Sequence, residues 1–88
     1  MTKEDFFVVW SGLKRTRCEV LRKEGDERYF EVYKEQEPLL EMLLLVMVTQ
    51  EGEKEIRRIC EKVDKIVHEE YKDLFGEEAT PCTEDYTR

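Results

Sequence analysis

The feature that most constrains the fold is an apolar run from Leu39 to Val48, in which Glu41 is the single charge. Elsewhere the chain is dense in charge, because 42% of its 88 residues are Asp, Glu, Lys or Arg. A chain of this length has room for one hydrophobic core and not for two. The run is also too short to span a bilayer, which takes about 20 apolar residues. It must therefore lie inside the core or be covered by another molecule.

The secondary structure of this run can be interpreted in two ways. Glu37-Pro38 suits the first turn of a helix, whereas the β-branched residues near Val46 and Val48 also suit a buried strand. We favour a helix over residues 39–50 that ends at Gly52. Such a helix has hardly any polar face, so it needs cover on all sides.

The clearest helical pattern follows Gly52 and covers residues 53–75. Its apolar residues recur at intervals of three and four and so share one helical face. The acidic residues at its start suit the positive end of a helix dipole. The residues of this face are Ile56, Ile59, Cys60, Val63, Ile66, Val67, Tyr71, Leu74 and Phe75.

The N-terminal half is interpreted as β-structure. Residues 17–35 read as a hairpin with its turn at Gly25-Asp26, although a looser helical stripe also fits them. Residues 6–13 are aromatic and β-branched, as strands prefer, yet their spacing also fits a helix capped by Thr2. Alternation would place four hairpin residues on one face of the sheet: Cys18, Val20, Phe30 and Val32.

The predicted fold is therefore α+β. We expect a small antiparallel β-hairpin or three-stranded meander in the N-terminal half, packed by an apolar helix and a long amphipathic C-terminal helix. This single globular domain is expected to cover residues 1–75. Residues 76–88 follow a helix-stopping glycine and lack periodicity, so they are predicted to form a flexible C-terminal tail.

The residues give little support to catalysis or metal binding. His68 is the sole histidine, and it follows Cys60 and Asp64 at four-residue steps, which would place three ligand types on one helical face. No second histidine exists to complete the site. The cysteines Cys18, Cys60 and Cys82 form no C-x-x-C pair, and no phosphate loop is present. We expect no catalytic residue, no metal site and no cofactor.

The preferred hypothesis is a small non-catalytic protein-interaction module. The apolar run would make it a homodimer or bind another protein. The predicted interface residues are Leu39, Leu40, Met42, Leu43, Leu44, Val46 and Met47.

The alternative hypothesis is a nucleic-acid-associated regulator. A basic cluster lies close in sequence to Trp10, Tyr29 and Tyr33, and cations beside aromatic rings can bind phosphates and stack on bases. A net charge of −7 makes nucleic acid the less favoured partner. The residues of this basic cluster are Lys14, Arg15, Arg17, Arg22 and Lys23.

The setting of the chain is inferred from composition. Its acidic N-terminus is wrong for a secretory signal, so we expect a cytoplasmic protein without membrane attachment. The many charges and the scarcity of side-chain amides follow the trend of proteins from heat-adapted organisms.

Overall fold

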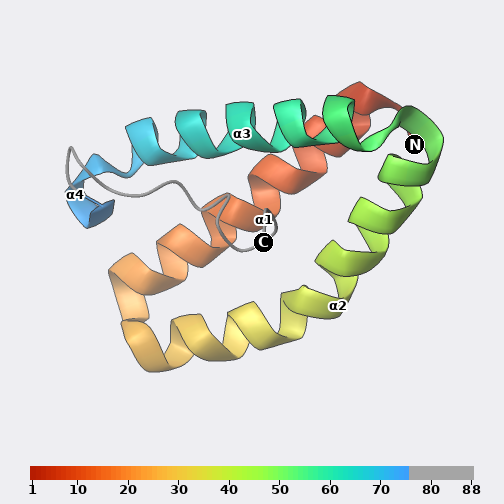
Figure 1. The fold of residues 1–88 in the computed structure, drawn as a ribbon. Helices are drawn as coiled ribbons and strands as arrows, with labels where there is room; N and C mark the ends of the chain where they lie inside the picture. Colours follow the sequence, from red (N-terminus) through yellow and green to blue (C-terminus); the bar gives the residue numbers. More distant parts are fainter. Residues whose placement is uncertain (76–88) are drawn as a thin grey trace.

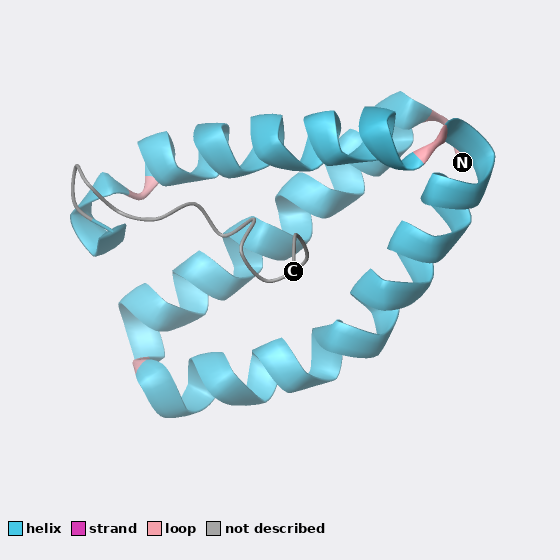
Figure 2. Ribbon diagram, in the orientation of Figure 1, coloured by secondary structure: helices cyan, strands magenta, loops and turns pink. Residues whose placement is uncertain are grey.

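The computed structural model describes residues 1–75 and contains three long helices and one short one. Helix α1 covers Lys3–Glu24, α2 covers Asp26–Glu51, α3 covers Glu53–Glu70 and α4 covers Lys72–Phe75. Figure 1 shows their arrangement, and Figure 2 shows that no strand occurs in the described part. The predicted α+β class is therefore wrong, and the fold is a bundle-like arrangement of helices.

Helix α1 replaces the strand expected over residues 6–13. Thr2 caps it: its hydroxyl accepts a hydrogen bond from the Asp5 backbone N–H at 3.1 Å, and the Asp5 carboxylate accepts one from the Thr2 N–H at 3.3 Å. This reciprocal capping box satisfies two donors that a helix start leaves open. The helical spacing of Phe6 and Trp10 then buries both side chains completely. Capping and spacing together outweigh the β-propensity of the segment.

The hairpin expected over residues 17–35 is two helices meeting at a corner. Gly25 does form the turn, but with φ 86° and ψ −172° it links the end of α1 to the start of α2. Only glycine adopts this backbone conformation readily. The hairpin would have put Cys18 and Phe30 on one face, whereas the structure buries Cys18 and leaves Phe30 63% exposed. The two-residue period of a strand therefore does not describe these residues, which follow the period of a helix.

Helix α2 includes the segment 39–50 that was expected to be helical, but it starts much earlier. It runs through Pro38, where the sequence predicted a helix start. A proline inside a helix lacks the N–H for the hydrogen bond four residues back, and its ring pushes against that turn, so it bends the helix. Figure 1 shows α2 changing direction near its middle. The bend lets the two halves of α2 lie along different parts of the molecule.

The amphipathic helix expected over residues 53–75 is present in two pieces. Helix α3 ends at Glu70, and Tyr71 leaves the helical conformation with φ −116° and ψ 39°. The short α4 follows. The predicted tail, residues 76–88, lies outside the described residues.

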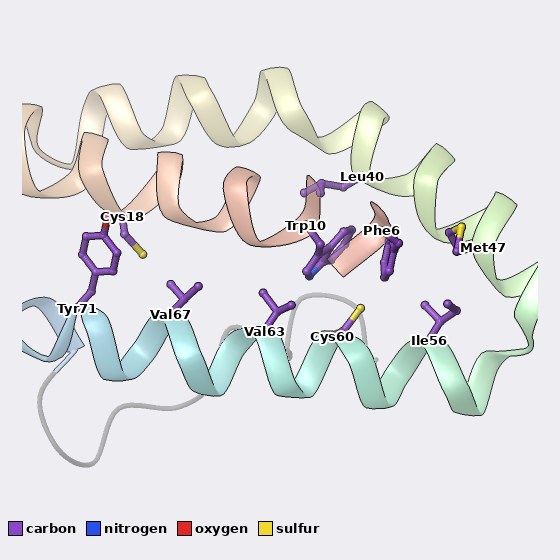
Figure 3. Packing of buried hydrophobic residues seen from close by; sticks show 10 residues of the cluster. All are labelled: Phe6, Trp10, Cys18, Leu40, Met47, Ile56, Cys60, Val63, Val67 and Tyr71. Atoms are coloured by element: carbon purple, nitrogen blue, oxygen red, sulfur yellow. The ribbon is translucent and has the colours of Figure 1, made fainter. Parts of the chain in front are cut away.

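Helix α1 lies between α2 and α3, as Figure 3 shows, and the core fills the space among them. Helix α1 runs antiparallel to α2 and in the same general direction as α3. The amphipathic face of α3 supplies the largest share of this core. The buried hydrophobic residues of the whole core are Phe6, Trp10, Cys18, Leu40, Met47, Ile56, Cys60, Val63, Val67 and Tyr71.

Candidate functional site

The apolar segment of α2 has one face in the core of its own subunit. Met47 is 0% exposed and Leu40 is 7% exposed; Figure 3 shows Leu40 beside Trp10 of α1, and Met47 near Phe6 of α1 and Ile56 of α3. Leu43 and Leu44 are partly buried beside them. These residues belonged to the predicted interface, and the structure gives Leu40 and Met47 an internal role instead.

The opposite face of the same segment is open to solvent. Leu39 is 48% exposed, Met42 65%, Leu45 69% and Val46 49%. We call these four residues the outer stripe. Leu45 was not among the predicted interface residues. Its position could have been found by asking which residues lie on the side of the helix away from the core positions 40 and 47.

An open groove of about 390 Å³ lies next to the outer stripe, between α2 and α3. Leu45 belongs to both, so the exposed apolar surface continues from the stripe into the groove. Acidic and basic side chains stand among the lining residues, and Arg57 there donates to Glu53 at 2.7 Å. The lining consists of Glu41, Leu44, Leu45, Val48, Glu53, Ile56, Arg57 and Cys60.

Two members of the predicted basic cluster are buried. Lys14 and Arg17 are each 3% exposed. The Lys14 ammonium lies 4.0 Å from an Asp64 carboxylate oxygen and 5.6 Å from the centre of the Trp10 ring. Arg17 donates its Nε–H to the side-chain oxygen of Gln36 at 2.8 Å. Their charges therefore act inside the subunit.

The Arg17 guanidinium also stacks over the Tyr33 ring, 4.3 Å from its centre. The nucleic-acid hypothesis had this ring stacking on bases instead. Cation–π contacts of this kind stabilise a desolvated cation. Tyr33 and Arg17 thus pack on one another.

The other three cations of the basic cluster form ion pairs at the surface. Arg15 donates to both carboxylate oxygens of Glu70 at 2.8 Å, and this hydrogen bonding holds the pKa of Glu70 below its usual value. Arg22 holds Asp73 in the same two-pronged way at 2.7 and 3.1 Å, which lowers the pKa of that carboxyl group. Lys23 lies 3.9 Å from a carboxylate oxygen of Glu19. Helix α1 is thereby tied to the C-terminal end of α3 and to α4.

Tyr71 marks the same end of the bundle. Its hydroxyl donates a hydrogen bond to Glu19 at 2.6 Å, and the Arg22 guanidinium lies 4.6 Å from its ring centre. Burial, together with the bond to the carboxylate, raises the pKa of Tyr71 to about 12.

The three candidate metal ligands remain on α3 but do not form a site. Cys60 and Asp64 are buried, whereas His68 is partly exposed. In residues 1–75, no three His, Cys, Asp or Glu side chains come close enough together to hold a metal ion.

Among residues 1–75, no helix combines the length and the apolar composition needed to cross a bilayer. Comparison of the chain with protein-family models, with curated protein sequences and with solved structures gives no match.

Proposed function

We propose that this protein is a small non-catalytic interaction module that self-associates through the outer stripe of α2. One observation carries the proposal: four large apolar side chains of one short segment are 48–69% exposed. Exposed apolar residues scattered singly are normal, but contiguous groups of them mark interaction surfaces. Here they adjoin an apolar groove, which enlarges the surface available to a partner.

The size of the stripe is compatible with a reversible dimer. The exposed fractions of its four side chains add up to about two and a third fully exposed residues. Full burial of such a side chain contributes roughly 2 kcal/mol, so a twofold pair gains about 10 kcal/mol from the stripe alone. Association itself costs about 4–15 kcal/mol. At the low end of this cost about 5–6 kcal/mol remains, so the stripe alone predicts a dissociation constant of roughly 100 μM at the tightest.

The charge distribution also supports a protein partner. Glu41 is the one charge between residues 39 and 50, and charged residues are depleted at the centres of protein interfaces. A second copy of the chain offers the same apolar stripe and needs no complementary charge.

The basic cluster supports no competing proposal. Its surface cations Arg15, Arg22 and Lys23 are engaged by carboxylates, and Lys14 and Arg17 are buried. At Arg15 and Arg22, a phosphate would have to compete with bonds that hold α1 to α3 and α4.

Analytical ultracentrifugation of a matched pair of variants tests the proposal. Leu45→Glu places a charge in the stripe, and Val8→Glu places the same charge at an equally exposed apolar position on α1, since the two side chains are 69% and 68% exposed. We expect the wild type and Val8→Glu to approach twice the 10.7 kDa chain mass at several hundred micromolar. Leu45→Glu should remain monomeric.

The magnitude of the Leu45→Glu effect follows from symmetry. Each pair loses two buried leucine side chains and desolvates two carboxylates, so the dissociation constant should rise at least about 100-fold. Circular dichroism should show the same helix content in all three proteins. A wild type that stays monomeric at several hundred micromolar, or equal effects of the two substitutions, would contradict the proposal.

A further inference from the structure

We propose that a small cavity between α1 and α2 binds a small zwitterion, a molecule with a carboxylate next to an ammonium group, as in a free α-amino acid. The cavity has a volume of about 70 Å³ and is lined by side chains of both helices. None of the outer-stripe residues lines it, so this proposal does not depend on self-association.

A buried arginine on the wall of the cavity has hydrogen-bond donors to spare. Arg17 is 3% exposed, its Nε–H donates to Gln36 at 2.8 Å, and its guanidinium stacks over Tyr33. Within residues 1–75, its two terminal NH₂ groups donate to no protein acceptor, and no carboxylate forms an ion pair with it. Buried donors are nearly always hydrogen-bonded, and these two NH₂ groups match the two oxygens of a carboxylate. A carboxylate in the cavity would supply the missing acceptors.

A second buried cation lines the same cavity. Lys14 is 3% exposed, and its ammonium lies 4.0 Å from a carboxylate oxygen of Asp64. Asp64 is therefore the one carboxylate paired with the two cations, Lys14 and Arg17. The inner wall keeps a net positive charge, and in this buried setting it attracts an anionic group more strongly than it would in water.

The mouth of the cavity has the opposite charge. Glu37 and Glu41 also line the cavity, both are exposed, and neither forms an ion pair within the described residues. Two exposed carboxylates repel a simple anion, including a nucleic-acid phosphate, and attract an ammonium group. A ligand that carries both charges satisfies the inner wall and the mouth together.

The size of the cavity limits the ligand. A volume of about 70 Å³ is little more than twice the roughly 30 Å³ that one water molecule occupies in the liquid. A carboxylate and the carbon attached to it fill this space, which leaves the ammonium group at the mouth. The rest of the wall is apolar or aromatic, with Trp10 and Leu40 side by side in Figure 3. Glycine, the smallest α-amino acid, is therefore the probe of choice.

Nuclear magnetic resonance of the whole chain tests the proposal. Trp10 lines the cavity and is the sole tryptophan, so its indole N–H gives one signal that reports on this place. The protein is kept well below the dissociation constant of the dimer, and the ionic strength is held constant. We expect glycine to shift the signal and to saturate it in the millimolar range. Acetate, which lacks the ammonium group, should bind at least about tenfold more weakly, and methylamine should not bind.

Variants at both ends of the cavity identify the groups that bind. Arg17→Gln should abolish the response to glycine. The double variant Glu37→Gln with Glu41→Gln changes exposed residues only, so it should fold even if Arg17→Gln does not. It should bind glycine no more tightly than acetate. Its matched control is Glu27→Gln with Glu35→Gln, which removes the same charge from exposed positions of α2 outside the cavity and should bind glycine as the wild type does.

Four results would overturn the proposal. An unchanged indole signal at about 50 mM glycine would mean that solvent alone serves Arg17. Acetate that binds as tightly as glycine would mean a simple anion site. Equal losses in the two double variants would mean that overall charge, and not the mouth of the cavity, governs binding. A folded Arg17→Gln that binds glycine normally would place the site elsewhere. Each of these results would leave the proposed self-association untouched.

Discussion

The buried contact between Lys14 and Asp64 gives the sharpest prediction about stability. The two side chains are 3% and 1% exposed, and their charged atoms lie 4.0 Å apart between α1 and α3. Removing one member of a buried ion pair leaves the other charge desolvated without its counterion, which costs about 3–5 kcal/mol. Replacing both by apolar residues of similar volume is often neutral or stabilising.

The magnitude is large for a chain of this size. At about 0.05–0.15 kcal/mol per residue, the free energy of unfolding should be about 4–13 kcal/mol. Asp64→Leu alone should therefore remove a large part of the total stability, and so should Lys14→Met. The double variant Lys14→Met with Asp64→Leu should recover most of the loss. The coupling energy from this double-mutant cycle should be about 3 kcal/mol or more.

Urea unfolding at one fixed protein concentration measures the effect. Circular dichroism follows the helices, and the fluorescence of the sole tryptophan, Trp10, follows the core beneath Lys14. Equal midpoints from both probes would support a two-state analysis. A loss below about 1 kcal/mol for Asp64→Leu, or a double variant as unstable as the two single losses added together, would refute the reasoning.

Three further predictions concern the core, a corner and pH. Met47→Ala should lower the free energy of unfolding by about 2–5 kcal/mol, because Met47 is 0% exposed, whereas Met42→Ala should change it little at monomeric concentrations; chemical denaturation compares them. Gly25→Ala should cost about 1–3 kcal/mol by the same measurement, because φ is 86° there. Tyr71 has a pKa of about 12 in the folded chain and 10 when unfolded, so its stabilising contribution is complete below pH 10 and is lost as the pH rises towards 12. Phenolate absorbance compared between the wild type and Tyr71→Phe checks the assignment, and a midpoint near 10 for Tyr71 would contradict it.

The sequence predicted helix α3 correctly because two independent signals agree there. Its apolar residues keep the helical period over several turns, and acidic residues stand at its start. The stop at Glu70 was missed because the apolar period continues through Tyr71 into α4. An amphipathic pattern identifies a helix well, but it carries little information on where the backbone leaves the helical conformation.

The N-terminal half was predicted wrongly because its local signals conflict. Gly25 marks a turn in a hairpin and also a corner between helices, so its presence does not choose between them. The ion pair of Arg28 with Glu31 has a helical spacing within α2 and is a sequence signal for the correct interpretation. The alternation of apolar residues over a few positions points the other way.

The ion pairs of the basic cluster could not be predicted from the sequence. Arg15 and its partner Glu70 are 55 residues apart, and Arg22 and Asp73 are 51 apart. Such pairs depend on how α1 lies against α3, which no local pattern specifies. The apolar segment was more predictable, since its excess of large side chains implied some exposure. Which of these side chains are exposed depends on which face of α2 packs into the core.

The single-residue corners at Gly25 and Gly52 have a consequence for how this chain can vary. Helices usually meet through loops, and loops are where insertions and deletions are tolerated. A helix turns by about 100° for each residue added, so one extra residue near either corner would rotate the following apolar face out of the core. Substitutions can accumulate over the whole surface of such a protein. The number of residues between the start of α1 and the end of α3 can therefore not change without disturbing the core.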